Sequence, residues 1–214
     1  MTEDVAKRPP GRPRAFDRDQ ALEAAVQLFW QHGFDGTSVA ELTKAMQIKP
    51  PSFYAAFGTK EALFREVLDI YLSKHANFVT RNLTRDQTAR ESIHAMLHGA
   101  AQAFAQEGLP RGCMVGSGGL HTSDESASLA QVLSGIRNRT RQFVQMRLDR
   151  AVTEGELPEG TDTQALAAYF SAVVQGLSVQ AIDGASLELL QHIVGTAMKA
   201  WPGAAAKASR KKAG

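Results

Sequence analysis

Few side chains in this sequence combine the type and the spacing that chemistry requires. The single cysteine, Cys113, lies two residues after Arg111, and its thiolate form could react with electrophiles or oxidants. His94 and His98 are four residues apart, so both imidazoles could face one metal ion from a helix. We favour the structural alternatives, which are a buried thiol and two half-buried polar side chains facing a neighbouring helix. We therefore predict no metal site.

The glycine-rich segment around Gly116 does not match a cofactor-binding or catalytic motif. The dinucleotide-binding pattern needs a third glycine at its sixth position, where this sequence has His121, and no strand pattern precedes the segment. There is no P-loop lysine, and Ser117 lacks the spacing of a nucleophile elbow. The sequence therefore predicts no catalytic residue and no cofactor. We interpret the segment as an irregular connector.

The pattern between residues 17 and 57 points most directly to a function. A periodic apolar face predicts a helix from Asp17 to His32, and Ser38 and Glu41 have capping-box spacing at the start of a short helix. Two prolines then open a helix over Pro50–Phe57, where the N–H that proline lacks would be unpaired anyway. A short second helix after a tight turn is typical of a helix-turn-helix, in which that helix enters the DNA major groove.

The predicted second helix has an inner and an outer side. Phe53 and Phe57 are four residues apart and are expected to be buried against the preceding helices. The small side chains of Ser52, Ala55 and Ala56 are expected to face outward, where they would let the backbone approach base edges. Tyr54 and, at the start of the next helix, Lys60 are placed to reach phosphates.

These residues carry a resemblance to a known family. Thr37-Ser38-Val39, followed by the run from Ile48 to Leu63 (IKPPSFYAAFGTKEAL), resembles the DNA-binding domain of TetR-family transcriptional regulators. The resemblance implies phosphate contacts from Thr37, Ser38, Tyr54 and Lys60, and base-reading positions at Lys49, Pro50, Ser52 and Ala55. Two prolines and two alanines leave few hydrogen-bond donors on this helix, so we expect readout largely by apolar contact and DNA shape.

Both ends of the chain are basic. Arg12 and Arg14 flank Pro13, which keeps the segment extended, and extended arginines favour narrow A·T-rich minor grooves. Residues 17–62 carry four basic and six acidic side chains, so we expect the arm to supply positive charge that this region lacks. The alternative is a linker without DNA contacts.

Helical periodicity extends over almost the whole chain, and no alternating strand pattern or internal repeat is present. Further helices are predicted to begin at Thr59, Ala89, Ser123 or Asp124, Asp162, and after Gly184. We therefore predict an all-α fold with four parts: a basic arm (1–14), a helix-turn-helix domain (15–62), a ligand-binding and dimerisation domain (63–202) and a basic disordered tail (203–214).

The last two predicted helices carry an apolar stripe that is too wide for one packing partner. We interpret it as half of a dimeric four-helix bundle, which would place two recognition helices on successive turns of a pseudo-palindrome. The alternative is a stripe buried within one chain. The stripe consists of Phe170, Val173, Val174, Leu177, Leu189, Leu190, Ile193, Val194, Ala197, Met198 and Trp201.

The family resemblance implies that the larger domain binds a small-molecule effector. Arg111-Gly112-Cys113 resembles a stretch found in a subset of TetR-like regulators, some of which respond to small electrophiles or organic acids. Most of the candidate ligand-binding residues would serve equally well as plain core. The candidates are Met96, Leu97, Phe104, Cys113, Met114, Phe143 and Tyr169.

Composition limits the remaining possibilities. The chain has 214 residues, 43% of them hydrophobic and 21% charged, which is ordinary for a globular protein. No run of about 18 apolar residues predicts a membrane span, and residues 1–4 lack the apolar core of a signal peptide. We predict a cytoplasmic homodimer that represses transcription until an effector releases it from its operator. The alternatives are an activator, or a helical small-molecule-binding protein or enzyme without specific DNA binding.

Overall fold

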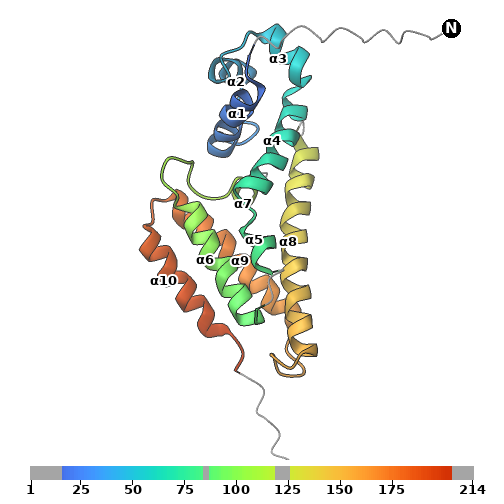
Figure 1. Cartoon of the computed structure of the whole chain (residues 1–214), viewed down its shortest axis with the longest axis vertical. Helices are drawn as coiled ribbons and strands as arrows, with labels where there is room; N and C mark the ends of the chain where they lie inside the picture. The colour runs from blue at the N-terminus through green and yellow to red at the C-terminus, as the bar shows by residue number, and fades with distance from the viewer. Residues whose placement is uncertain (1–15, 84–86, 119–125, 204–214) are drawn as a thin grey trace, which may run out of the picture.

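The computed structural model describes residues 16–83, 87–118 and 126–203, and within these ranges it contains helices and no strand. The predicted all-α fold is confirmed. Figure 1 shows α1, α2 and α3 grouped at one end of an elongated molecule, while α6, α9 and α10 lie toward the other end. The helices are α1 (Arg18–His32), α2 (Val39–Ala45), α3 (Pro50–Phe57), α4 (Lys60–Lys74), α5 (Phe78–Leu83), α6 (Ala89–Phe104), α7 (Met114–Ser117), α8 (Ala127–Thr153), α9 (Thr163–Ile182) and α10 (Leu187–Ala197).

Side-chain caps fix several of the predicted helix starts. Ser38 and Glu41 form the predicted capping box at α2, and the Thr59 hydroxyl accepts a hydrogen bond from the N–H of Ala62 at α4. Asp162 caps α9 in the same way. These caps satisfy N–H groups that the helix itself leaves unpaired. The predicted start of α8 at Ser123 or Asp124 lies outside the described residues.

The apolar interior forms two clusters, and the boundary between them does not follow the chain order. One cluster joins α5, α6, α9, α10 and the second half of α8. The other joins α1–α4 with Met114 and Val115 of α7 and with Leu129, Leu133 and Ile136 of α8. The helices of the predicted DNA-binding domain thus share their core with the next part of the chain. The predicted boundary after residue 62 falls inside α4.

The segment from Gly112 to Met114 joins the two clusters through hydrogen bonds. From α1, Trp30 Nε1 donates to the Gly112 carbonyl at 3.1 Å. From α4, the Tyr71 hydroxyl donates to Cys113 Sγ at 3.4 Å and accepts from the Met114 N–H at 3.2 Å. Burial, reinforced by the neighbouring sulfur, raises the pKa of Tyr71 well above its usual value, so the hydroxyl keeps its proton.

The same segment is also held by α9. The Cys113 N–H donates to Ser178 Oγ at 2.8 Å, and the Arg111 guanidinium donates to the Ala185 carbonyl just beyond α9. Gly112 has φ +80°, and a Cβ built there would lie 2.6 Å from Ile182 Cγ1 and 2.9 Å from the Ser178 carbonyl oxygen. A side chain at this position would therefore separate the segment from α9.

A buried ion pair closes the far end of the bundle. Arg147 on α8 is 2% exposed and donates to Glu156 Oε1 at 2.9 Å and to the Gln87 carbonyl at 2.8 Å. Glu156 also accepts the Ala89 N–H at the start of α6. Burial acts to raise the pKa of Glu156, but the Ala89 N–H and the Arg147 guanidinium outweigh it, and the pKa is lowered. This pair fixes α6 against the end of α8.

We predict that Gly112→Ala destabilises the protein by more than Gly108→Ala. Both glycines have positive φ, but a Cβ at Gly108 meets nothing within 4 Å. Gly108→Ala should therefore cost only the backbone strain, ~1–2 kcal/mol, while Gly112→Ala adds the clash with α9. Urea unfolding of both variants measures the difference, and equal losses would contradict the close packing of Gly112 on α9.

We predict that Glu156→Gln lowers the free energy of unfolding by about 1.5–3 kcal/mol at neutral pH, because it removes the charge that Arg147 faces. Since the folded pKa is lowered, this contribution is complete above about pH 4.3, and the gap between wild type and variant narrows as the pH falls further. Glu154→Gln is the control: Glu154 is 47% exposed and lies 3.8 Å from Arg147. Urea midpoints at several pH values provide the comparison, and a pH-independent gap would count against the pair.

Candidate functional site

The outer face of α3 matches the predicted DNA-reading surface. Phe53 and Phe57 are buried as predicted, with Phe53 completely inaccessible to solvent. Tyr54 is 54% exposed, and its ring lies edge-on against Phe53 with the centroids 5.3 Å apart. Lys49, Pro50, Pro51 and Ala55 are exposed, and Ser52 is half-buried. The helix therefore presents a small, mostly apolar surface on an aromatic base.

Of the four predicted phosphate contacts, Ser38 and Tyr54 lie on the exposed surface. The Ser38 hydroxyl accepts the Glu41 N–H at 3.1 Å and donates to Glu41 Oε2 at 2.7 Å. Hydrogen bonds from the Ser38 N–H and then from its hydroxyl lower the pKa of Glu41. Glu41 therefore stays ionised and holds Ser38 at the N-terminus of α2, where backbone N–H groups favour a phosphate oxygen.

The structure gives the other two predicted phosphate contacts internal partners. Thr37 is 1% exposed, and its hydroxyl donates to the Gly33 carbonyl at 2.7 Å. Lys60 Nζ donates to the carbonyls of Phe34 and Thr37, both at 3.0 Å, and lies 4.0 Å from the centroid of the Phe34 ring. Both side chains therefore fix the α1–α2 connection against α4, and we leave them out of the proposed DNA contacts.

Arg18 is a positioning residue that the sequence pattern did not single out. Its guanidinium forms a two-pronged ion pair with Glu66 of α4, with Nη2 2.7 Å from Oε2, and its Cζ lies 5.0 Å from the centroid of the Phe57 ring. The hydrogen bonds that Arg18 donates to the Glu66 carboxylate raise the pKa of Arg18. One side chain of α1 thus holds both α3 and α4. The predicted minor-groove residues, Arg12 and Arg14, lie outside the described residues.

A cavity of about 240 Å³ lies among α4, α5, α8 and α9. It brings together only two of the predicted ligand-binding residues, Cys113 and Phe143. The Cys113 sulfur accepts hydrogen bonds from Tyr71 and, at 3.3 Å, from the Gly116 N–H at the first turn of α7. The cavity wall is therefore continuous with the segment that joins the two core clusters.

The remaining predicted ligand-binding residues lie elsewhere. Met96, Leu97 and Phe104 are buried in the bundle core, because α6 turns its apolar face toward α5 and α9. Tyr169 is 40% exposed, and its hydroxyl lies 3.5 Å from the Ala197 carbonyl on α10. Met114 lines a different cavity. An apolar helical stripe does not reveal whether it faces a core or a cavity, so the pattern could not separate these positions.

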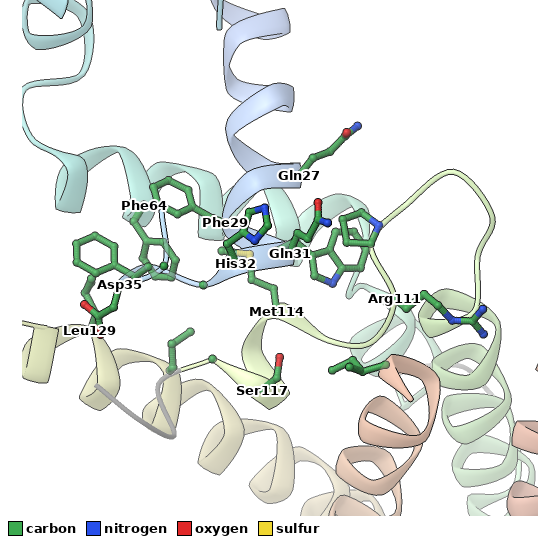
Figure 2. Close-up of a pocket in the computed structure, with 18 of the residues that line it drawn as sticks. Gln27, Phe29, Gln31, His32, Asp35, Phe64, Arg111, Met114, Ser117 and Leu129 are labelled. Atoms are coloured by element: carbon green, nitrogen blue, oxygen red, sulfur yellow. The ribbon is translucent and has the colours of Figure 1, made fainter. Parts of the chain in front are cut away.

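That second cavity, of about 830 Å³, lies between the end of α1 and α7. Figure 2 shows Gln31 and His32 of α1 on one side and Met114 and Ser117 of α7 on the other. Its lining includes Gly118 and Ser126, which flank residues 119–125, outside the described part of the chain. The lining of the smaller cavity contains no residue adjacent to this gap.

The two histidine rings stack on each other; His98 is half-buried and contacts α10, as expected, whereas His94 is exposed. The rings of His94 and His98 lie 6.1 Å apart, and His98 Nε2 is 3.4 Å from Gln191 Nε2. Among the described residues, no group of three or more His, Cys, Asp or Glu side chains is arranged to hold a metal ion.

Most of the predicted stripe on α9 and α10 is buried or half-buried within the protomer, as the alternative interpretation required, and Leu189 is its one exposed member, at 47%. Val179 on α9, outside the predicted stripe, is 51% exposed. By length and composition α9 could cross a membrane, with 28% of its apolar window buried in the protein. Its contacts with α6, α8 and α10 make it a bundle helix with one face open.

Comparison with known proteins finds two family matches along the chain. Residues 21–67 match the family described as "Bacterial regulatory proteins, tetR family", and residues 62–194 match "Tetracyclin repressor-like, C-terminal domain". The chain is 38% identical to the HTH-type transcriptional repressor ComR of Escherichia coli (strain K12), over 92% of this chain and 94% of that protein. It is 36% identical to the repressor BdcR of the same strain, over 89% and 91%.

Solved structures agree with this relationship. A cysteine-substituted variant of the TetR family transcriptional regulator CifR, complexed with 26 bp double-strand operator DNA, superposes with a TM-score of 0.85. The two are 42% identical, and the match covers 89% of this chain and 100% of that one. With family matches spanning both the helix-turn-helix and the larger helical region, this chain belongs to the TetR family of bacterial transcriptional regulators.

Proposed function

We propose that this protein is a cytoplasmic, ligand-responsive repressor that binds a pseudo-palindromic operator as a homodimer. The observation that carries the proposal is the exposed face of α3, where Lys49, Pro50, Tyr54 and Ala55 stand on a buried aromatic base. The repressors ComR and BdcR and the operator complex of CifR support the same function. The role is one of binding DNA and effector, without catalysis.

The exposed apolar face of α9 and α10 supports dimerisation through these two helices. A second copy would cover Val179 and Leu189 in a four-helix bundle across a two-fold axis. The symmetry would present two copies of α3, and a spacing of about 34–36 Å would place them in successive major grooves on one side of the DNA.

The coupling between effector and DNA is proposed to pass through the Gly112–Met114 segment. We propose that the effector occupies the 240 Å³ cavity, which meets this segment at Cys113, and the same segment contacts Trp30 of α1 and Tyr71 of α4. An effector that favours a different position of Cys113 would shift α4 and α1, and with them the spacing of the two copies of α3. Cys113 serves here as a structural thiol whose sulfur accepts two hydrogen bonds.

We predict that Lys49→Ala weakens binding to the DNA upstream of the protein's own gene by about tenfold, since a base-reading contact contributes ~1–3 kcal/mol. Lys74→Ala is the matched control, because Lys74 is 62% exposed at the opposite end of α4 from α3. Fluorescence anisotropy over a range of salt concentrations measures both. If both substitutions weaken binding equally, and to the same extent on promoter and random DNA, only non-specific attraction is present and the proposed readout is overturned.

We predict that Leu189→Glu yields a folded monomer with greatly weakened operator binding. The side chain is 47% exposed in the single chain, so a carboxylate there should leave the protomer intact while opposing its burial in a dimer. Leu189→Met is the control and should remain dimeric. Sedimentation with circular dichroism measures assembly and folding together, and a stable Leu189→Glu dimer would place the interface elsewhere.

A further inference from the structure

The middle of α8 concentrates positive charge without compensating acids. Arg137, Arg139 and Arg141 lie within five residues, and no acidic residue occurs in α8 before Asp149. In the described part of the chain, none of the three arginines forms an ion pair, although Arg147 and Arg150 on the same helix do. The unpaired charge is therefore confined to one stretch of the helix.

Two of these arginines line the 240 Å³ cavity, and its lining contains no Asp or Glu from the described residues. Arg137 Nη1 donates to the carbonyls of Val115 and Gly118, at 2.7 and 3.0 Å. These bonds hold the guanidinium at the wall, and they are its only hydrogen bonds to the described residues. Arg139, two residues further along α8, is exposed and also lines the cavity. The cavity is thus positively charged at the side formed by α8.

The remaining wall is apolar with a few hydroxyl and amide groups. Leu72, Val79, Phe143 and Val174 provide much of its apolar surface. Ser171 also lines it, and its Oγ is buried with no hydrogen-bond partner in the structure. A buried hydroxyl without a partner is costly and suits a polar group of a bound molecule. A volume of about 240 Å³ is below the ~300–1,000 Å³ of pockets for drug-sized ligands.

We propose that the effector is a small organic carboxylate, with its charged group on Arg137 and Arg139 and its apolar body against Phe143 and Val174. This inference rests on the proposed function and specifies the ligand of its cavity. Guanidinium groups match carboxylates because two parallel N–H donors meet two oxygens. A body that extends from α8 across this cavity reaches Cys113, where the contacts to α1 and α4 begin.

The test uses the full chain and matched pairs of acids and neutral amides. Butanoate, hexanoate and benzoate are compared by calorimetry with butanamide, hexanamide and benzamide, and inorganic phosphate serves as an anion without an apolar body. At least one acid should bind about tenfold or more tightly than its amide, because its carboxylate accepts charge-assisted hydrogen bonds that the neutral amide cannot match. That acid should also release fluorescent promoter DNA, and phosphate should do neither.

Arg139→Gln should weaken binding of that acid by about tenfold. Arg141→Gln is the matched control: it removes the same charge from the same helix at a position outside the cavity lining, and it should change affinity less than about twofold. Arg137→Gln should also weaken binding, and circular dichroism reports whether this variant folds. If the Arg137→Gln variant does not fold, the comparison of the Arg139 and Arg141 variants tests the proposal on its own.

The proposal is overturned if every acid binds no better than its amide, if the Arg139 and Arg141 variants lose affinity equally, or if a bound acid leaves promoter DNA in place. The proposed function is judged separately by the unliganded protein. Promoter binding without any response to acids would retain the repressor and reject the carboxylate. Acid binding by a protein that ignores its promoter would reject the repressor.

Discussion

The shared hydroxyl of Tyr71 is the interaction on which the rest of the arrangement depends. It gives its proton to Cys113 Sγ and accepts the Met114 N–H, so a residue of α4 holds the chain where α7 begins. Trp30 packs edge-on against Tyr71, with centroids 4.8 Å apart, and contacts the same segment through Gly112. Hydrogen bonds thereby connect α1 and α4 to the wall of the 240 Å³ cavity.

Several polar side chains of α1–α4 make internal contacts that fix these helices against one another. Lys60 and Thr37 hold the α1–α2 connection, and Arg18 links α1 to Glu66 while lying over Phe57. The orientation of α3 is therefore set by neighbours that a movement of α4 would carry along. Under the proposed coupling, a displacement near Cys113 would be passed to α3 through these contacts.

Helix starts could be predicted from the sequence because they depend on neighbouring residues. The features that could not be predicted depend on packing between distant parts of the chain. The caps at Ser38 and Thr59 and the proline start of α3 follow from the needs of unpaired N–H groups, so sequence alone located them. The inward turn of Lys60 depends on carbonyls 23 and 26 residues away, and the core position of Met96 depends on which helices face α6. The spacing of residues along one helix therefore predicts neither the inward turn of Lys60 nor the core position of Met96.

The core shared by α1–α4 and α8 has a consequence for the order of folding during synthesis. Leu129, Leu133 and Ile136 complete the apolar cluster around α1 and α4, so a nascent chain that ends after α4 leaves that cluster uncovered. The apolar core around α1–α4 is therefore complete only after more than half of the polypeptide has left the ribosome. Fragments that end after α4 should therefore aggregate, because they expose this apolar cluster. We do not expect them to bind DNA as independent domains.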